Sequence, residues 1–350
     1  ERTFRRKKDA EELSCGFEDI KNKLKREQYK HYTMKVSVVI ICMNNLGNLY
    51  PCLDSIIKHT HVSYEIFVVA FMFSDENLQI LKRDYPSVKI VESNELRGFS
   101  ENNNLALRKT IGEYCYIVND DTLTDDNVID KLCKTFDSGK EDNIAIVSPL
   151  ILNKDGSVQR NGKCPYNIYT YCLQIFKLKK VYDKMSKYTG GSGIYQTYNI
   201  SGSCFMIKRD IFEKVGWLDE RYYFCPEDIA LSTKINKIGF KCIVNTNAVI
   251  THIHGGTWSK ILPATMPTAA KGNLIFYTEN NAWFKPFFIL TSWLYYGIGG
   301  IKWWVKYKII HSEEAQAKYT ANINCVKTIA NKETPKQLFV RLYNELKRKK

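Results

Sequence analysis

The feature that most constrains this chain is a regular alternation of short apolar runs and amphipathic segments, which begins at Lys35. The apolar runs have the length of strands and cover residues 36–42, 66–70, 88–91, 114–118 and 144–152. Helical periodicity falls between them, at 53–57, 76–84, 100–109 and 124–136. Strands buried on both faces are continuously apolar, so the pattern predicts an α/β fold whose mostly parallel sheet carries helices on both faces. Ligands of such sheets bind beyond the carboxyl ends of the strands.

The second half of the chain follows the same pattern less strictly. It loosens at 161–197 and then resumes with a strand at 200–208, a helix at 228–238 that stops at Gly239, and short strands at 242–244 and 248–251. We therefore expect one α/β domain in two halves, with a further segment on either side of it: a charged extension at 1–33, the halves at 34–145 and 146–260, and a helical tail at 261–350.

Charge and cysteine content narrow the class of protein. Apolar residues make up 44% of the chain, which excludes a wholly disordered polypeptide. Lys and Arg number 51 against 37 Asp and Glu, so the net charge of +14 favours an anionic partner: nucleic acid, a phosphate-bearing small molecule or an acidic membrane surface. The 11 cysteines form no C-x-x-C pair and several lie in apolar runs, which is typical of small buried residues in a reducing compartment. The charged N-terminal segment does not have the pattern of a signal peptide.

The tail combines an aromatic, uncharged stretch with a basic one. Residues 287–301 carry no charge, but this is shorter than the roughly 20 residues of a membrane span. The segment 302–350 then contains twelve Lys and Arg against four Glu. The stretch fits either an interfacial or re-entrant membrane helix or a helix docked on the rest of the protein. A membrane surface explains the composition better than nucleic acid, so we expect a peripheral location at the cytosolic face of the cell membrane and no nucleic-acid partner.

Acidic and imidazole side chains follow two of the strands. Asn119, Asp120 and Asp121 stand where the strand at 114–118 ends. Such carboxylates suit a divalent cation that also holds a diphosphate, and they equally suit a turn in which Asp caps backbone amides. His252 and His254 are two residues apart at the end of a strand and share a face there, which alone is a weak metal signal.

Two helix starts carry charged residues that have a functional and an ordinary explanation. Glu227 and Asp228 open a helix, where carboxylates either act as a general base or cap the helix. Arg97 precedes a helix N-terminus at the expected ligand edge, which suits either a phosphate site or an ordinary cap. The chain contains no P-loop, no G-x-G-x-x-G after the first strand and no G-x-S-x-G, which counts against NTPases, dinucleotide dehydrogenases and serine hydrolases.

Taken together in order and spacing, these motifs resemble the family-2 glycosyltransferases of the GT-A fold, particularly the rhamnosyltransferase-like enzymes of bacterial surface polysaccharide synthesis. The resemblance covers roughly residues 35–260. The matching stretches are VSVVIICMN at 36–44, RGFSENNN at 97–104, NDDT at 119–122, LNKDGSVQ at 152–159, SGS at 201–203, VGWLDERYY at 215–223, ED at 227–228 and HGG at 254–256.

The resemblance implies an inverting, metal-dependent transfer of a sugar from a nucleoside diphosphate, most simply UDP- or dTDP-linked, to a glycan or lipid-linked acceptor. It implies that 34–145 binds the donor and 146–260 the acceptor. Asp228 would be the catalytic base, with Glu227 and Trp217 on the acceptor side. The implied ligands of Mn²⁺ or Mg²⁺ are Asp121, His254, Asn119 and His252. The implied donor-binding residues are Met43, Asn44, Arg97, Asn103, Asn104 and Asp120.

One departure from the family pattern affects donor recognition. After the second strand the family carries an acidic residue that recognises the nucleobase, whereas this chain has Ala70-Phe71-Met72-Phe73. Base recognition would then use backbone contacts or stacking on Phe71. The altered loop also supports an alternative function, a non-catalytic module that binds sugar nucleotides or glycans on the same scaffold, although the presence of Asp121 and Asp228 argues for an enzyme.

Overall fold

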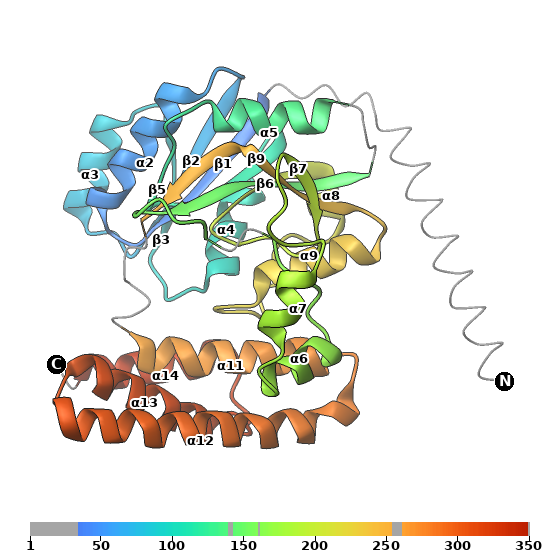
Figure 1. The fold of residues 1–350 in the computed structure, drawn as a ribbon. Coiled ribbons are helices and arrows are strands. Elements are labelled where there is room, and N and C mark those ends of the chain that lie inside the picture. Colours follow the sequence, from blue (N-terminus) through green and yellow to red (C-terminus); the bar gives the residue numbers. More distant parts are fainter. Residues whose placement is uncertain (1–33, 139–142, 160–161, 254–260, 349–350) are drawn as a thin grey trace.

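The structure is a computed structural model that describes residues 34–138, 143–159, 162–253 and 261–348. Its core is a nine-stranded sheet in the order β3-β2-β1-β4-β8-β6-β9-β5, with β7 paired to β9 (Figure 1). The first four strands are parallel to one another: β1 (Met34–Cys42), β2 (Tyr64–Phe71), β3 (Lys89–Ser93) and β4 (Gly112–Asn119). This block forms the first half of the predicted sheet.

Strand β8 (Cys204–Lys208) runs against both of its neighbours and joins the two halves of the sheet. Beyond it, β6 (Ile144–Asn153) and β9 (Lys241–His252) are again parallel to each other. Two short strands, β5 (Thr122–Leu123) and β7 (Ile194–Thr197), pair antiparallel with β9. The predicted mostly parallel sheet is confirmed.

Helices cover both faces of this sheet and bury two separate cores. One core contains Val36, Val38 and Ile40 and is covered by α2 (Leu46–His59), α3 (Asp75–Asp84) and α5 (Val128–Asp137). The other contains Val39 and is covered by α4 (Phe99–Leu107), α8 (Arg209–Lys214) and α9 (Glu227–Lys237). These four valine and isoleucine side chains are fully buried, which is why the strand has no polar alternation.

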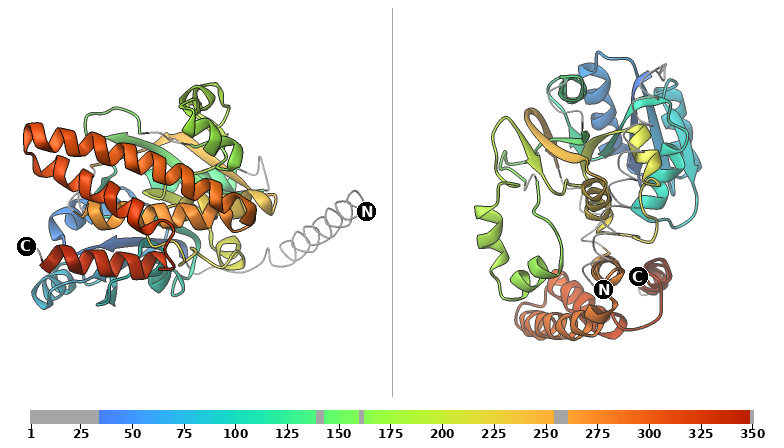
Figure 2. Two further views of the ribbon diagram at one scale, coloured as in Figure 1. Left: turned by 90° about the horizontal axis from the view of Figure 1, so that it is seen from below. Right: turned by 90° about the vertical axis from the view of Figure 1, so that its right-hand side faces the viewer.

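The C-terminal part forms a layer of helices below the sheet (Figures 1 and 2). It consists of α11 (Leu262–Thr278), the short helix η1 (Ala282–Phe284), α12 (Lys285–Ile310), α13 (Glu313–Thr328) and α14 (Pro335–Arg348). Two further helices, α6 (Ile168–Ile175) and α7 (Lys179–Met185), lie between this layer and the sheet, and Tyr171 of α6 stacks on Phe288 of α12. Among the described residues, no helix combines the length and apolarity needed to cross a membrane.

The helical layer touches the loop that precedes α9. Gly272 of α11 lies so close to the carbonyl group of Cys225 that a Cβ atom there would collide with it. Phe339 of α14 packs against Tyr223. Lys336 of the same helix forms an ion pair with Glu101 of α4, with 2.6 Å between Nζ and Oε1. The C-terminal helices therefore support the segment that leads into Glu227.

Several predicted boundaries are wrong. Helix α4 begins at Phe99, so Ser100, where the helix was expected to begin, is an internal, buried residue. Helix α5 was expected to begin at Thr124 and begins only at Val128, and the Thr124 hydroxyl donates instead to the carbonyl oxygen of Asp126. The two short strands expected at 242–244 and 248–251 form one strand, β9, which bulges where the register changes between Pro149 and Leu150 of β6.

Candidate active site

The carboxyl ends of β1 to β4 meet at one edge of the sheet. The register pairs Ile41 with Asn119 and Phe71 with Ser93. The predicted donor-side residues on these strand ends and on the loops that follow them therefore lie along one edge, as expected for a parallel sheet.

An acid and an imidazole group meet at this edge. Strand β5 pairs with β9 so that Thr122 stands opposite His252. This pairing brings Asp121 Oδ1 to 3.1 Å from His252 Nε2, and Asn119 Nδ2 lies 3.4 Å from the same nitrogen. The His252 side chain is only 9% exposed. Three of the four predicted metal ligands are therefore together, and the fourth, His254, lies outside the described residues.

Burial changes the acidity of Asp120. Removal from water raises the pKa of its carboxyl group to about 6, and the Asp121 carboxylate adds to that rise. The Cys42 thiol and His252 act in the opposite direction by favouring the ionised form. The Asp120 carboxyl group thus holds its proton to a higher pH than an ordinary aspartate does.

The side chains of this cluster supply some, but not all, of the ligands that a hard divalent cation needs. Asp121 offers a carboxylate oxygen and His252 an imidazole nitrogen, and the Asn119 amide lies beside them. Carboxylate and carbonyl oxygens suit Mg²⁺ and Mn²⁺. Within the described ranges, no three His, Cys, Asp or Glu side chains converge on one point. The described residues thus provide a carboxylate–imidazole pair that fits a cation and needs further ligands to complete its shell.

The end of β1 exposes Asn44 as expected, whereas the end of β2 exposes a different residue from the expected Phe71. Asn44 is exposed and has a φ of 49°, and its side-chain oxygen accepts hydrogen bonds from the Ser74 amide and the Asn77 side chain at 3.0 and 2.9 Å. The Phe71 ring is only 9% exposed and belongs to the core, whereas Met72 is 36% exposed with a φ of 53°. The residue at this edge that can meet a planar ligand is therefore Met72, and stacking on Phe71 is not supported.

Arg97 and the two asparagines that follow it have partners within the protein. Arg97 Nη2 lies 2.9 Å from Glu95 Oε2, and Nη1 donates to Ser93 Oγ at 3.3 Å. Asn104 is fully buried and bonds the backbone of Leu218 through both ends of its amide, at 2.9 and 3.2 Å. Asn103 is also buried and donates to the Phe99 carbonyl. Both asparagines therefore hold α4 in place. Of these three residues, Arg97 is the one whose side chain lies at the end of β3, beside Ser93.

The second half of the site is the carboxylate pair at the start of α9. Asp228 Oδ2 accepts hydrogen bonds from the Gly202 amide at 3.0 Å and from Lys163 Nζ at 2.9 Å. Asp228 Oδ1 accepts from the Ile229 amide at 2.8 Å. Both Glu227 and Asp228 are buried. Asp228 is thus held in one orientation by three donors, one of them a cation.

Glu227 has the opposite environment. Burial raises the pKa of its carboxyl group to about 8, and the negative charge of Asp228 adds to the rise. Its Oε2 atom is buried and has no hydrogen-bond partner among the described residues. The pair therefore consists of Asp228, a carboxylate stabilised by hydrogen bonds from the protein, and Glu227, a carboxyl group that holds its proton near neutral pH.

Sequence reasoning missed Lys163. It lies in the segment 161–197, which has no periodicity, and a single lysine there has the pattern of a surface residue. Its side chain is only 21% exposed because β-bridge pairing with Asn199 holds it beside α9. No local signal in the sequence identifies this lysine.

A three-residue segment connects the two halves of the site. The Asn119 amide donates to the Ser203 carbonyl oxygen at 3.0 Å, and the Gly202 amide donates to Asp228. Since consecutive residues span at most about 3.6 Å each, this path keeps the Asn119 backbone within roughly 10 Å of the Asp228 carboxylate. The site thus combines an acid–imidazole cluster with a buried carboxylate pair, joined through Gly202 and Ser203.

Trp217 does not belong to this arrangement. Its ring packs on Phe212 at 5.2 Å and under the guanidinium group of Arg209 at 5.7 Å. Arg209 in turn donates to the carbonyl group of Thr110, near the start of β4 and thus at the edge of the sheet opposite Asn119. Trp217 follows Gly216 in a left-handed turn and is a packing residue, so the acceptor-side role expected for it lacks structural support.

A family model described as glycosyl transferase family 2 matches residues 37–216, which is just over half of the chain. Among curated proteins, the chain is 26% identical over 87 residues to an N-acetylglucosaminyl-diphospho-decaprenol L-rhamnosyltransferase of Mycobacterium tuberculosis. That match covers 25% of this chain and 28% of the relative. The chain is also 20% identical over 225 residues to the O-antigen biosynthesis protein RfbC of Myxococcus xanthus, covering 63% of this chain and 17% of the relative. The matches thus span less than a third of the length of these relatives.

Two solved structures also resemble the chain. One is GalNAc-T7 with UDP, GalNAc and Mn²⁺, with 20% identity and a TM-score of 0.49 over 64% of this chain and 44% of that chain. The other is the mannosyltransferase PcManGT from Pyrobaculum calidifontis in complex with GDP-Man and Mn²⁺, with 17% identity and a TM-score of 0.47 over 96% of this chain and 90% of that chain.

Proposed function

The chain belongs to glycosyl transferase family 2, and from this membership we propose that it transfers a sugar from a nucleoside diphosphate to a hydroxyl group of a glycan or lipid-linked acceptor. The donor is a UDP- or dTDP-linked hexose or rhamnose, the anomeric configuration inverts, and the product enters a capsule, O-antigen or cell-wall polysaccharide. The observation that carries the proposal is the segment 201–203, whose backbone bonds link Asn119 to Asp228.

The donor occupies the carboxyl edge of β1 to β4. Met43 and Asn44 lie beside the nucleobase, with Met72 in the place expected for Phe71. Arg97 and the N-terminus of α4 face the diphosphate, because helix N-termini and guanidinium groups both attract phosphate oxygens. Asp120 lies on the sugar side of the same edge.

Asp121 and His252, with Asn119 beside them, hold Mn²⁺ or Mg²⁺ in this proposal, and His254 is a further candidate outside the described residues. When bound, such a cation offsets the negative charge that gathers on the leaving diphosphate. The 3.1 Å contact between the Asp121 carboxylate and the His252 ring supports this assignment, since it brings two possible metal ligands together.

Asp228 is the general base. It takes the proton of the acceptor hydroxyl while that oxygen forms a bond to the anomeric carbon from the face opposite the leaving group. The bond between the anomeric carbon and the phosphate oxygen breaks, and the nucleoside diphosphate leaves with its electron pair. Lys163 and the Gly202 amide hold Asp228 in its carboxylate form for this step, and a protonated Glu227 avoids a second buried negative charge beside it.

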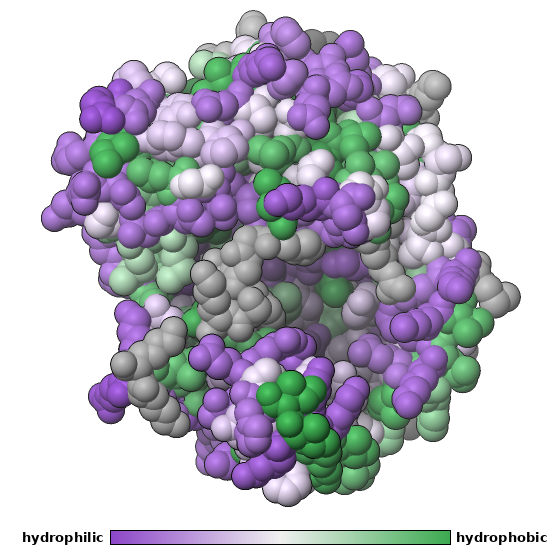
Figure 3. Space-filling model, turned by 60° about the vertical axis from the view of Figure 1, so that its left-hand side comes forward, coloured by the Kyte–Doolittle hydropathy of each residue, from purple (hydrophilic) through white to green (hydrophobic). Residues whose placement is uncertain are grey.

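We also propose that α12 rests on the surface of an anionic membrane. Trp303 of this helix lies between lysines, with Lys306 Nζ 4.9 Å and Lys318 Nζ 4.4 Å from its ring. Figure 3 shows hydrophobic side chains gathered at the lower end of the molecule, on the helical part. Aromatic and aliphatic residues beside lysines are typical of interfacial helices. Helix α12 carries an exposed apolar stripe, at least 43% exposed at each position, which contains Phe287, Leu290, Leu294, Ile298, Ile301, Val305 and Ile309.

Vesicle binding tests the membrane proposal. We expect co-sedimentation with phosphatidylglycerol vesicles and much less with phosphatidylcholine vesicles. Ile298→Glu should weaken binding, because it places a charge at a position that is 67% exposed on the apolar face. Ile194→Glu is the matched control, at a 54% exposed site on β7. Equal loss in both variants, or no binding by the unaltered protein, would show that α12 does not bind lipid.

Donor binding is tested by thermal shift with UDP, dTDP, GDP and CMP, each with and without Mn²⁺. A ligand at 100 times its dissociation constant adds about 2.7 kcal/mol of stability. We expect a manganese-dependent shift with UDP or dTDP, followed by release of that nucleotide from its sugar donor in the presence of acceptor. A nucleotide shift without any turnover would instead support the non-catalytic binding module, which the burial of Phe71 at the altered loop favours.

A further inference from the structure

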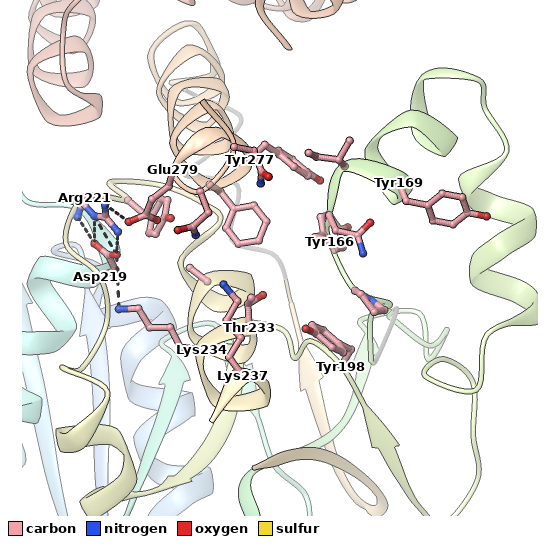
Figure 4. A pocket seen from close by; sticks show the side chains of 18 residues that line it. Tyr166, Tyr169, Tyr198, Asp219, Arg221, Thr233, Lys234, Lys237, Tyr277 and Glu279 are labelled. Carbon is pink, nitrogen blue, oxygen red and sulfur yellow. Dashed lines mark hydrogen bonds and ion pairs between the residues drawn. The ribbon is translucent and has the colours of Figure 1, made fainter. Parts of the chain in front are cut away.

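A second concavity lies on the side of α9 that faces away from Asp228. It is bounded by α9, by the segment 165–169 that leads into α6, by Tyr198 and by residues 276–281 at the end of α11 (Figure 4). Its volume of about 580 Å³ lies within the roughly 300–1,000 Å³ typical of ligand pockets. None of the described residues assigned above to the donor, the cation or the base lines it.

Aromatic rings form much of the wall of this concavity. Tyr166 and Tyr198 stand opposite α9, and Tyr277 closes the side formed by α11 (Figure 4). Tyr169 lies further out and is 62% exposed. Tyrosine presents a flat apolar face and a polar hydroxyl group, so such rings suit a ligand that has an apolar face and a polar rim.

Polar and charged side chains complete the wall of the concavity, and the positive charges are largely paired with carboxylates. Arg221 is paired on both sides, with Asp219 and with Glu279, each at 2.7 Å. The ammonium group of Lys234 lies 3.9 Å from Asp219. Amide side chains contribute further donors and acceptors, and they belong to Asn167, Asn280 and Asn281. A ligand with several phosphate groups would find most of the positive charge here already neutralised, whereas hydroxyl groups would find partners throughout.

One group in the wall lacks a partner. The hydroxyl oxygen of Thr233 on α9 is buried and makes no hydrogen bond within the described part of the chain. Buried hydroxyl groups are almost always hydrogen-bonded in folded proteins. Thr233 is therefore a polar residue of this wall whose hydrogen-bonding capacity the described chain leaves unused.

The concavity and the base share one helix. Asp228 is in the first turn of α9, and the wall residues Ala230, Thr233 and Lys237 follow on its opposite face within about three turns. The two places are also joined by the loop that carries Lys163, the partner of Asp228, and Tyr166, three residues later. A chain of sugar units with its reacting end at Asp228 can therefore follow this loop into the concavity.

We propose that the concavity between α9, α6 and α11 binds sugar units of the acceptor beyond the unit that receives the new sugar. That the bound saccharide is an acceptor depends on the proposed glycosyl transfer. That the concavity binds saccharide does not depend on it, because this follows from the tyrosine faces, the paired charges and the unsatisfied hydroxyl group.

The test is saccharide binding in the absence of any donor. Saturation-transfer NMR would measure the affinity of the unaltered protein for three soluble tetrasaccharides, built from N-acetylglucosamine, from glucose and from rhamnose. We expect at least one to bind at millimolar concentration or tighter, with affinity falling roughly threefold to tenfold in Tyr166→Ala and in Tyr198→Ala. Tyr166→Phe and Tyr198→Phe keep the ring and should restore most of the affinity, which separates lost stacking from misfolding. Tyr319→Ala, on α13 and outside the concavity, is the matched control.

Each outcome has a distinct meaning. If none of the three tetrasaccharides binds, or if binding is insensitive to both alanine variants, the proposed subsite is wrong. A loss of UDP or dTDP binding in these variants instead would identify the concavity as part of a nucleotide site. Saccharide binding without any sugar transfer by the unaltered protein would overturn the proposed function and leave the subsite standing.

Discussion

The two halves of the site are built in different ways. The acid–imidazole cluster uses Asn119, Asp120 and Asp121, which are adjacent in the chain and stand directly after a strand, and strand pairing alone brings in His252. The carboxylate pair on α9 depends instead on Lys163 and Gly202, which come from separate segments. The first half is therefore set by local sequence and sheet register, whereas the second depends on how distant loops pack.

The C-terminal helices extend this contrast. They do not touch the acid–imidazole cluster through any contact found among the described residues, but α11 and α14 support the loop at 223–225 that leads into Glu227. We infer that changes in this layer affect the carboxylate pair more than the cluster. The following predictions test whether the two halves differ as this comparison requires.

The largest effect is expected at Asp228. Asp228→Asn removes the proton acceptor and should lower kcat by about 10²–10⁴-fold. Glu227→Gln is the matched comparison on the same turn, and we expect a much smaller loss because the Glu227 carboxyl group already holds a proton near neutral pH. Initial rates of nucleotide release measure both. A larger loss in Glu227→Gln than in Asp228→Asn would assign the base to Glu227.

Asp121 should come next. Asp121→Asn removes the carboxylate that meets His252, and we expect a loss of activity on the order of 10²–10³-fold, as for other groups that stabilise a developing negative charge. The manganese-dependent part of the thermal shift with nucleotide should also disappear. Asp75→Asn, at the exposed start of α3, is a control of the same chemistry. Unchanged manganese dependence in Asp121→Asn would remove this residue from the cation site.

Lys163 is expected to act through Asp228, as a positioning residue. Lys163→Met removes the cation 2.9 Å from the carboxylate, and with it one of the three donors that orient Asp228. We expect kcat to fall roughly tenfold, with little change in the KM for the sugar donor, because the base is misplaced while donor binding is untouched. Lys163→Arg keeps the charge and a donor and should restore most of kcat. An equal loss of kcat in the arginine variant would indicate a purely structural lysine.

Glu227 also makes a prediction for stability. Its pKa of about 8 in the folded protein lies above the ordinary value of 4.5, so the folded state binds the proton more tightly than the unfolded chain. The contribution is therefore fully present below about pH 4.5 and is lost as the pH rises through about 8, by an amount on the order of 5 kcal/mol. Urea unfolding at several pH values measures it. Glu227→Gln should flatten this dependence between pH 5 and 8, and an unchanged slope would place the titration elsewhere.

The sequence predicts the parts of this molecule that depend on neighbouring residues. The continuous apolar runs predict β1 to β4 and the helices that alternate with them. The polar residues at the end of β4 predict where the acid–imidazole cluster lies. Lys163, the bulge in β9 and the packing of Trp217 on Phe212 depend on contacts between segments far apart in the chain. Trp217 shows the limit most clearly, because its place in a motif suggested a ligand contact while its contacts are those of a core residue.

The smallest effect on turnover is expected from alanine substitutions in the helical layer, at two helical glycines that differ in the space available for a Cβ atom. Gly272→Ala places a methyl group against the Cys225 carbonyl, and overpacking of this kind typically costs about 1–3 kcal/mol. Gly297→Ala meets nothing within 4 Å on α12, so it should stabilise the protein by about 0.5–1 kcal/mol through helix propensity alone. Because Cys225 precedes α9, Gly272→Ala should also lower kcat severalfold while leaving the manganese-dependent nucleotide shift unchanged. Equal effects on both halves of the site would mean that the helices support the whole sheet domain and not the carboxylate pair alone.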